Sequence, residues 1–240
     1  MSHTLFISDL HLAPERPQIT GQFIAFAREV ASRAEALYIL GDLFEYWIGD
    51  DDVEEPLNRE IEDALARLVE TGTAVHFMHG NRDVLVGAQF AQRCGVRLLA
   101  DPALVDLYGT PTLLMHGDTL CIDDLEYQKF RAYAHDPKNQ AQFLALPPQA
   151  RRERMRGWRA ESESSKLDKT DAIMDVSPAA VEQTLREHGY PRMIHGHTHR
   201  PARHLHRIDG RTCERWVLND WFVRGGYLRC DAAGCTPVTL

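Results

Sequence analysis

The chain has 240 residues, of which 44% are hydrophobic and 26% are charged, and its formal net charge is −8. No apolar run is long enough to cross a bilayer, so the composition predicts a globular protein without a membrane-spanning helix. The acidic balance argues against a general nucleic-acid binder, whose surface is normally basic. The N-terminus enters a strand within a few residues and lacks the features of a signal peptide, so we expect a cytoplasmic chain.

The cysteines agree with a cytoplasmic chain, because they are odd in number and form no C-x-x-C pair. Structural zinc sites usually contain such closely spaced pairs. We therefore expect buried thiols rather than zinc ligands at all five positions: Cys94, Cys121, Cys213, Cys230 and Cys235.

Strand and helix patterns alternate through the first half of the chain. Five short apolar runs predict buried strands: Leu5–Ile7, Leu37–Leu40, Val75–Met78, Leu113–Met115 and Met193–Ile194. Between the first three runs, apolar residues recur at helical spacing: Phe23, Phe26, Ala27 and Val30, then Leu57, Ile61, Leu65 and Leu68. The alternation predicts an α/β fold.

Between Cys121 and Val176 the strand signal disappears. Arg, Glu, Gln, Ala and Lys dominate there, and prolines at Pro137 and Pro147-Pro148 interrupt the segment. We interpret it as a helical insertion that caps the site and sets specificity. The alternative is a packed accessory helix pair with solvated charges. Positive charge concentrates in its second part, at Arg151, Arg152, Arg154, Arg156, Arg159, Lys166 and Lys169.

The C-terminal part predicts one more helix and then strands. Ser177-Pro178 is typical of a helix start and Gly189 of a helix stop, which gives a helix over Ala179–His188. Asp209-Gly210 predicts a hairpin, and the apolar runs beyond it predict a closing β-meander. The acidic run at residues 50–55 is expected to be a solvated loop and helix start.

Each of the five apolar runs ends in a potential metal ligand. The side chains concerned are Asp9, His11, Asp42, Asn81, His116, Asp118, His197 and His199. A ligand just past the end of a buried strand is held rigidly and faces a crevice. A single Asp or His after a strand is often only a turn residue, but the ordered set of five predicts a two-metal hydrolytic site.

The ordered motifs carry a resemblance. The series D-x-H at Asp9, G-D-x-x-E at Gly41, G-N-x-D at Gly80, H-G-D at His116 and G-H-T-H at Gly196 resembles the calcineurin-like metallophosphoesterase superfamily. That resemblance implies a sandwich of two mixed β-sheets flanked by helices, as a single domain over residues 1–240 with a helical cap insertion at 122–175. It also implies one metal held by Asp9, His11 and His199, a second held by Asn81, His116 and His197, and Asp42 bridging both.

Trp47-Ile-Gly49 and Arg82 mark a closer resemblance, to the UDP-2,3-diacylglucosamine pyrophosphatase family of lipid A synthesis. It implies hydrolysis of the pyrophosphate to UMP and 2,3-diacylglucosamine 1-phosphate, with two divalent ions, of which Mn²⁺ is the best expectation. We further expect a monomer, which a lipidic substrate rather than an anchor brings to the cytoplasmic face of the inner membrane. The implied catalytic residues are Asp42, Asn81, Arg82, His116 and Asp118. The implied substrate contacts are Asn81, Arg82, Asp124, Ser162, Lys166, Lys169 and His197.

Arg82 is informative because many superfamily members have His at this position, where it protonates the leaving oxygen. A guanidinium stays charged near neutral pH and cannot act as a general acid, but it binds phosphate in a bidentate manner. This exchange favours a leaving group that is itself a phosphate. The alternative is that Arg82 only forms an ion pair with Asp83 or Asp118.

Two histidines, His79 and His195, stay ambiguous, and we expect His195 to support the ligands from behind. Asp118 is expected to orient a metal ligand. Two other functions remain open: a soluble nucleotide pyrophosphatase or cyclic-nucleotide phosphodiesterase, and a metal-free binding scaffold on the same fold.

Overall fold

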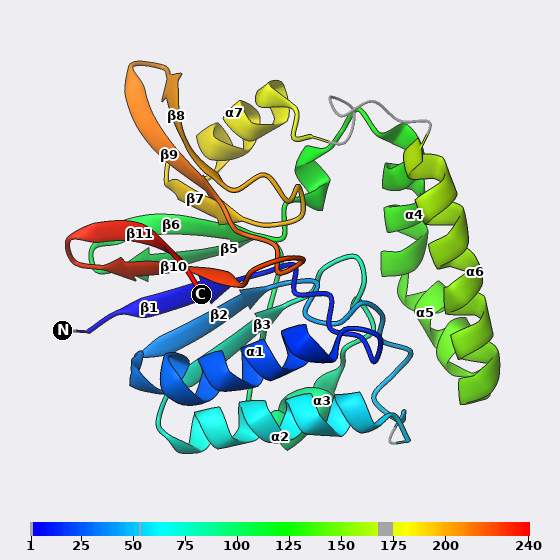
Figure 1. Cartoon of the computed structure of the whole chain (residues 1–240). Coiled ribbons are helices and arrows are strands. Elements are labelled where there is room, and N and C mark those ends of the chain that lie inside the picture. Colours follow the sequence, from blue (N-terminus) through cyan, green and yellow to red (C-terminus); the bar gives the residue numbers. More distant parts are fainter. Residues whose placement is uncertain (1, 53, 168–174) are drawn as a thin grey trace.

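Two β-sheets lie face to face, and helices cover their outer faces (Figure 1). The computed structural model describes residues 2–52, 54–167 and 175–240, and residues 160–167 by their backbone alone. The first sheet has the order β11-β10-β1-β2-β3-β4 and the second the order β5-β6-β7-β9-β8. Both contain parallel and antiparallel neighbours, so the predicted α/β sandwich of two mixed sheets is confirmed.

The strands of the first sheet are β1 (Thr4–Ile7), β2 (Ala36–Leu40), β3 (Ala74–Met78), β4 (Arg97–Leu99), β10 (Gly226–Asp231) and β11 (Gly234–Thr239). Those of the second are β5 (Ala103–Leu107), β6 (Thr110–Met115), β7 (Arg192–His195), β8 (Ala202–Ile208) and β9 (Arg211–Val217). All five predicted runs are strands, because each is short, apolar and rich in branched or long side chains that pack on both faces of a sheet.

Side chains alternate between two cores along each strand of the first sheet. In β1, Phe6 packs between the sheets, whereas Leu5 and Ile7 pack under the helices. The second sheet shows the same alternation, since Leu114 joins the core between the sheets and Leu113 packs with the helix outside it. Side chains on both faces of these strands are therefore packed, which holds the strands in place.

Helices α1 (Pro17–Glu29), α2 (Pro56–Glu70) and α3 (Ala88–Cys94) cover the first sheet, and α7 (Pro178–Glu187) covers the second (Figure 1). The short helices η1 (Ala31–Arg33) and η2 (Asp118–Leu120) lie in connections. Helices α1 and α2 match the periodicity of the sequence, and α7 matches the predicted start and stop signals. Each of the three begins with a proline in its first turn, where a missing N–H costs nothing.

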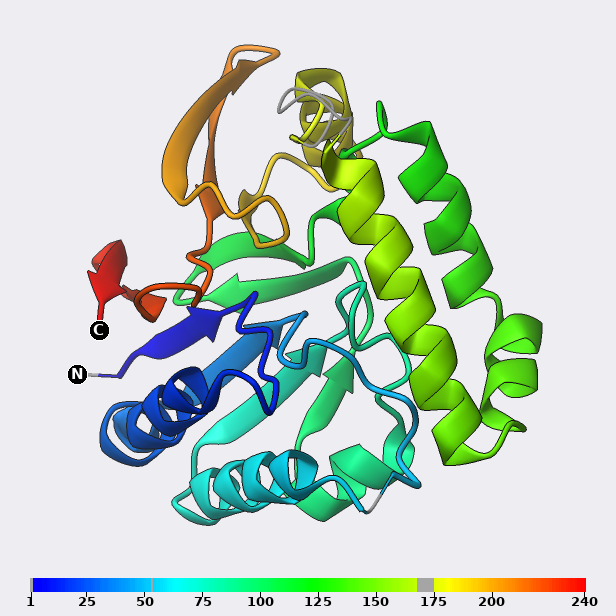
Figure 2. The same ribbon diagram turned by 45° about the vertical axis from the view of Figure 1, so that its right-hand side comes forward.

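The predicted insertion forms three helices, α4 (Leu125–His135), α5 (Pro137–Leu144) and α6 (Pro148–Leu167). The breaks fall at the predicted prolines, because proline fits a first turn and disrupts a helix interior. Figures 1 and 2 show the three helices gathered beside the sandwich, at the edge to which β1, β2 and β3 point. We call residues 125–167 the cap.

The acidic loop at Asp50–Asp52 is not merely solvated, contrary to expectation. Asp51 accepts two hydrogen bonds from the guanidinium of Arg151, at 2.7 and 2.5 Å, and Arg151 also donates to the carbonyl of Ile48 at 2.7 Å. Asp52 pairs with Arg152. Arg151 is only 1% exposed, whereas the side chain of Asp51 is 58% exposed, so this loop anchors α6 to the sandwich through a half-buried, charge-assisted contact.

The expected C-terminal meander is wrong. β8 and β9 form the predicted hairpin, whose turn has positive φ at both Asp209 and Gly210, but β10 and β11 pair in the other sheet. Trp221 fixes the crossing between the sheets, because its indole is fully buried and donates to the Gly226 carbonyl at 3.1 Å. The last strands thus tie the two layers together.

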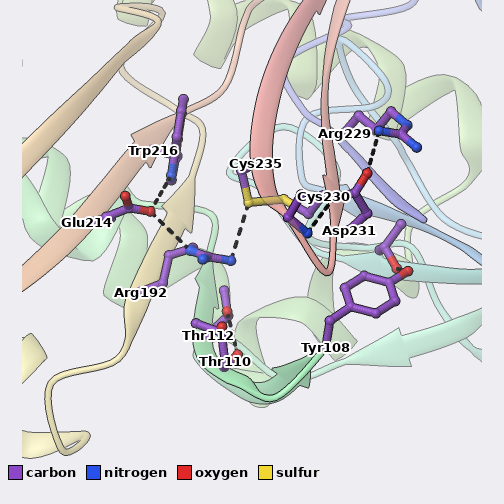
Figure 3. The surroundings of a disulfide bond; sticks show 12 residues. Tyr108, Thr110, Thr112, Arg192, Glu214, Trp216, Arg229, Cys230, Asp231 and Cys235 are labelled. Atoms are coloured by element: carbon purple, nitrogen blue, oxygen red, sulfur yellow. Dashed lines mark hydrogen bonds and ion pairs between the residues drawn. A yellow bond between two sulfur atoms is a disulfide. The ribbon is translucent and has the colours of Figure 1, made fainter. Parts of the chain in front are cut away.

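Two of the five cysteines are not thiols. Cys230 and Cys235 form a disulfide across the β10–β11 hairpin (Figure 3). The hairpin register places them directly opposite each other, with 4.1 Å between their Cα atoms, which sequence spacing alone did not reveal. Cys94, Cys121 and Cys213 are buried free thiols, as expected.

Candidate metal centre

The loops after five strands meet at one edge of the sandwich. β1, β2 and β3 are parallel neighbours in one sheet, and β6 and β7 are parallel neighbours in the other. The carboxyl ends of parallel strands lie at the same edge, so their loops converge although they are far apart in sequence. These loops carry all seven expected metal ligands: Asp9, His11, Asp42, Asn81, His116, His197 and His199.

Backbone strain concentrates at this edge. Eight of the described non-glycine residues have positive φ, a region that side chains rarely adopt. Five of the eight are expected ligands, with φ of 57° at Asp9, 49° at His11, 54° at Asp42, 69° at His197 and 53° at His199. Such strain persists only where surrounding structure holds it, and it clusters at functional sites.

Asp9, His11 and His199 form the first group of donors. The Nε2 atoms of His11 and His199 are 3.3 Å apart, and His199 Nε2 lies 3.4 Å from Asp9 Oδ1. Asp9 is fully buried, and among the described residues its Oδ1 has no hydrogen-bond partner. A buried carboxylate oxygen left in this way is costly unless a cation or other partner satisfies it.

Asn81, His116 and His197 form the second group. Asn81 Oδ1 lies 3.2 Å from His116 Nε2 and 3.1 Å from His197 Nδ1. Asp42 stands between the two groups, because its Oδ2 is 3.8 Å from His11 Nε2 and also 3.8 Å from His116 Nε2. The carboxylate is therefore placed to face both groups at once.

The convergence of carboxylates and imidazoles shifts their protonation. Burial alone would lower the pKa of His116, but the nearby carboxylates of Asp42, Asp118 and Asp9 raise it to about 9. Burial and the charge of His116 lower the pKa of His197 to about 3. Burial would raise the pKa of Asp9, yet the adjacent imidazoles of His199, His116 and His11 hold it below its usual range. The carboxylates thus favour a positive charge, on a protonated imidazole or on a cation, beside Asp9 and Asp42.

Two glycines let the loops approach closely. A Cβ on Gly80 would lie 2.1 Å from Asp42 Oδ1, and one on Gly41 would lie 2.5 Å from His116 Nδ1. Gly41 also has a φ of +91°. These positions exclude every side chain for steric reasons, which explains why glycine precedes Asp42 and Asn81.

Backbone groups orient several of the donors. His116 Nδ1 is 2.9 Å from the Leu40 carbonyl, so this contact, rather than one to Asp118, sets the direction of its ring. Asp42 Oδ1 accepts a hydrogen bond from the backbone N–H of Arg82 at 2.8 Å. Asp83, which the sequence suggested only as an ion-pair partner of Arg82, accepts bonds from backbone amides of both loops, including Gly80 and Leu43 at 2.8 Å.

Asp118 contacts the cap rather than a ligand. Its Oδ2 accepts hydrogen bonds from the Tyr127 hydroxyl and from Arg131 Nε, each at 2.7 Å. The Tyr127 ring lies 5.5 Å from that of His197, so the pair connects α4 to the second group of donors. Tyr127 and Arg131 carried no signal in the sequence, because neither belongs to a strand-end motif.

Glu45 is another functional residue that the sequence reasoning did not place. It is the last residue of the G-D-x-x-E motif and is 8% exposed. His11 Nδ1 lies 3.2 Å from its carboxylate, and the guanidiniums of Arg82 and Arg159 lie 3.8 and 3.6 Å away. The ion pair of Arg82 is thus with Glu45, rather than with Asp83 or Asp118 as in the alternative interpretation.

A cavity of about 740 Å³ joins the donors to the cap. This volume falls within the ordinary range for ligand sites. Rings line the side formed by the cap, where Trp158 contacts Phe143, Phe130 and Tyr133 with centroids 5.5, 6.0 and 6.2 Å away. Polar and aromatic side chains both line the cavity, among them His11, Asp42, Glu45, Asn81, Arg82, Asp124, Phe130, Tyr133, Phe143, Met155, Trp158, Arg159, His197 and His199.

Comparison with known proteins identifies the family. Residues 2–201 match the model of the calcineurin-like phosphoesterases. The chain belongs to this family.

Relatives of the phosphoesterase chain are similar over nearly their whole length. A protein of Aromatoleum aromaticum named UDP-2,3-diacylglucosamine hydrolase is 54% identical over 98% of this chain and 96% of the relative. Proteins with the same name from Stenotrophomonas maltophilia and Xanthomonas campestris pv. campestris are 50% and 52% identical. They cover 99% and 96% of this chain, and 98% and 96% of the relatives.

The donor set of this phosphoesterase fits divalent metal ions. Two groups bring ligand atoms within 4.8 Å of one another, namely Asp9, His11 and His199, and Asp9, Asp42 and His116. Carboxylate, imidazole and amide donors without thiolate suit Mn, Fe, Zn or Mg. The unsatisfied buried oxygen of Asp9 agrees with such a role.

The expected substrate contacts of the phosphoesterase fall into two sets. Asn81, Arg82, Asp124 and His197 line the cavity, and Asp124 also accepts a hydrogen bond from the Tyr127 amide at 3.1 Å as the N-cap of α4. The side chains of Ser162 and Lys166, and the whole of Lys169, lie outside the described residues. His79 and His195 contact backbone carbonyls, of Val86 and Gly196 respectively.

Proposed function

We propose that the chain hydrolyses the pyrophosphate bond of UDP-2,3-diacylglucosamine to UMP and 2,3-diacylglucosamine 1-phosphate. The observation that carries this proposal is a single cavity that has a metal-type donor cluster at one end and aromatic rings of the cap at the other. Relatives named for this substrate, at 50–54% identity over nearly the full length, support it. The substrate has a polar, charged head and two acyl chains, so it needs both a polar and an apolar surface in its binding site.

We assign one metal ion to Asp9, His11 and His199 and a second to Asn81, His116 and His197, with Asp42 shared between them. Mn²⁺ is our choice of ion. Two divalent ions, when bound, lower the pKa of water towards neutrality and neutralise charge on phosphoryl oxygens. The position of Asp42 Oδ2, equidistant from His11 and His116, supports the sharing.

The residues around the donors bind and orient the phosphates. Water attacks one phosphorus, the bond to the bridging oxygen breaks, and the other phosphate leaves with that oxygen. Because a phosphate leaving group departs without a proton, no general acid is needed, and Arg82 with Arg159 serves by binding charge. Both arginines line the cavity, where their donors face the same space. We keep Asp118 as a catalytic support that holds Tyr127 and Arg131 against the donors.

The cap supplies the surface for the acyl chains. Phe130, Tyr133, Phe143, Met155 and Trp158 line its side of the cavity. Phe130 and Tyr133 pack edge to face on Trp158, and Phe143 stacks on it. These rings form an apolar surface that pairs well with methylene chains. We propose that Asp124, Ser162, Lys166 and Lys169 add polar contacts to the substrate.

The relation to the membrane follows from the substrate. Among the described residues, no helix has both the length and the apolar character to span a bilayer. We propose that the chain works at the cytoplasmic face of the inner membrane and takes its lipid from that surface. A monomeric state, and the division into one domain with residues 122–175 as its cap, stay predictions.

Turnover of two matched substrates tests the proposal. We expect hydrolysis of UDP-2,3-diacylglucosamine, and little hydrolysis of the water-soluble UDP-N-acetylglucosamine, which has the same pyrophosphate but no acyl chains. Mass spectrometry of the products made in ¹⁸O-water identifies the phosphorus that is attacked. Equal rates on both substrates would favour a soluble nucleotide pyrophosphatase, and absence of both turnover and bound metal would favour a binding scaffold.

A further inference from the structure

Glu45 sits where three separate segments meet. Its backbone is fixed to the loop that carries His11, because Glu45 N donates to the Leu12 carbonyl at 3.0 Å and Leu12 N donates to Leu43 at 2.9 Å. The side chain points into the cavity and is 8% exposed. Its position is therefore set by the core and not by solvent.

The two oxygens of Glu45 face different partners. Oε2 lies 3.2 Å from Nδ1 of His11, while Oε1 lies 3.8 Å from Arg82 and 3.6 Å from Arg159. The three partners come from the loop after β1, the loop after β3, and α6 of the cap. One carboxylate thus connects a metal-type donor with two cations on opposite walls of the cavity.

The contact with His11 determines which way the ring faces. Nε2 of His11 is turned towards His199 and Asp42, so Nδ1 is left for the carboxylate. A histidine that binds a metal through one nitrogen commonly donates from the other to a carboxylate, which fixes its tautomer and raises its basicity. Glu45 places a carboxylate 3.2 Å from Nδ1 of His11, within ion-pair range, although Nδ1 has no hydrogen-bond partner among the described residues.

The contacts of Glu45 with the two arginines are ion pairs rather than hydrogen bonds. At 3.6 and 3.8 Å the guanidiniums are within ion-pair range but beyond a direct hydrogen bond. Two cations facing one cavity repel each other, and an anion between them offsets that repulsion. The charge of Glu45 therefore allows the two guanidiniums to lie beside the same cavity.

We propose that Glu45 is a positioning residue that couples metal binding at His11 to phosphate binding by Arg82 and Arg159, and so links the cap to the metal centre. This inference rests on the proposed function, since it takes the phosphate to be that of the nucleotide-linked lipid. Glu45 itself does not touch the reacting atoms.

Two substitutions separate the halves of this role. Glu45→Gln keeps an oxygen that can accept from His11 but removes the charge, so we expect near-normal Mn²⁺ affinity and a KM raised about tenfold, the effect of one charge-assisted contact. Glu45→Ala removes both, and we expect Mn²⁺ affinity to fall about 10–100-fold as well. Glu62→Gln, which removes a carboxylate paired with Arg93 on the surface, is the control and should leave both values unchanged.

Calorimetric titration of the chelator-treated protein with Mn²⁺, together with steady-state kinetics, measures the two effects. A merely structural role would lower the melting temperature of both variants alike without separating Mn²⁺ affinity from KM. Unchanged KM in Glu45→Gln, or a lowered KM, overturns the link to the arginines. Unchanged Mn²⁺ affinity in Glu45→Ala overturns the link to His11.

A double-mutant cycle tests the connection to the cap. In an Arg159→Met background, Glu45→Gln should raise KM by a smaller factor than in the unmodified chain, because one of its partners is gone. The same factor in both backgrounds overturns the coupling.

These measurements distinguish failure of the inference from failure of the proposed function. If the unmodified chain does not hydrolyse UDP-2,3-diacylglucosamine, the proposed function fails. The Mn²⁺ titrations remain valid, and the affinity for inorganic pyrophosphate in the presence of Mn²⁺ replaces KM as the readout for the arginines.

Discussion

The metal centre and the cap differ in how they hold their functional side chains. The donors stand on short loops directly after buried strands, and most of them are almost inaccessible, as for Asp9 at 0% and His116 at 1%. The rings of the cap stand on helices with a single sheltered side, where Phe130 is 39% and Tyr133 is 45% exposed. The side chains of the metal centre are thus fixed by burial, whereas the rings of the cap stay partly exposed beside the cavity.

Attachment to the rest of the chain shows the same contrast. The centre is built into the sandwich, whereas charged pairs join the cap to it: Arg151 with Asp51, Arg152 with Asp52, Arg159 with Glu45 and Arg131 with Asp118. Exposed ion pairs contribute little, but a buried one is strongly destabilising to break. Substitutions in the metal centre should therefore change kcat and metal content, whereas substitutions in the cap should change KM or the free energy of unfolding.

The largest effect is expected at the shared carboxylate. Asp42→Ala should lower kcat on the order of 10³-fold, since several kcal/mol of stabilisation by the ions would be lost. Elemental analysis should find less metal in the purified protein. Asp63→Ala, an exposed aspartate on α2, is the matched control. Full metal content with normal turnover in Asp42→Ala would refute the assignment of Asp42.

A smaller loss is expected when the loops are pushed apart. Gly80→Ala places a methyl group against Asp42 Oδ1, and a displacement near 1 Å can cost about 10²-fold in rate. Gly21→Ala is the control, because its Cβ would meet nothing within 4 Å and it lies inside α1. That control should be stabilised by roughly 0.5–1 kcal/mol in thermal unfolding. Normal turnover in Gly80→Ala would show that the loops yield more readily than their packing suggests.

In the cap, Trp158→Ala should change substrate affinity and leave the metal centre intact. Loss of the ring that contacts Phe130, Tyr133 and Phe143 should raise KM for the diacyl substrate about tenfold, because a large apolar contact is removed. Mn²⁺ affinity should stay the same. A fall in Mn²⁺ affinity with unchanged KM would contradict the assignment of substrate binding to the cap and metal binding to the centre.

The smallest effect on activity is expected at the anchor of α6. Arg151→Met leaves the Ile48 carbonyl and Asp51 without their partner, which should lower the free energy of unfolding by about 1–3 kcal/mol and raise KM only a few-fold. Thermal denaturation and kinetics measure both. Arg154→Met, an exposed neighbour on the same helix, serves as the control. If both variants melt alike, the contacts of Arg151 with Asp51 and the Ile48 carbonyl do not anchor the cap.

The metal centre and the cap differ in how many of their functional residues could be predicted from the sequence. Asp9, Asp42 and His116 were predictable because a polar residue after an apolar run marks a strand end, and strand ends of this fold meet at one edge. The helices of the cap were equally predictable from Pro137 and Pro148. Glu45, Tyr127 and Arg151 were not, because their roles depend on partners 34 to 100 residues away or on another helix.

The sequence by itself determined the α/β layers, the edge at which the donors gather, and the family, since local periodicity and ordered motifs carry that information. Only the tertiary structure decided that the acidic loop anchors the cap, that the last two hairpins belong to different sheets, and that Cys230 faces Cys235. These features depend on which distant segments lie side by side, and that outcome results from the packing of the whole chain rather than from any one stretch of it.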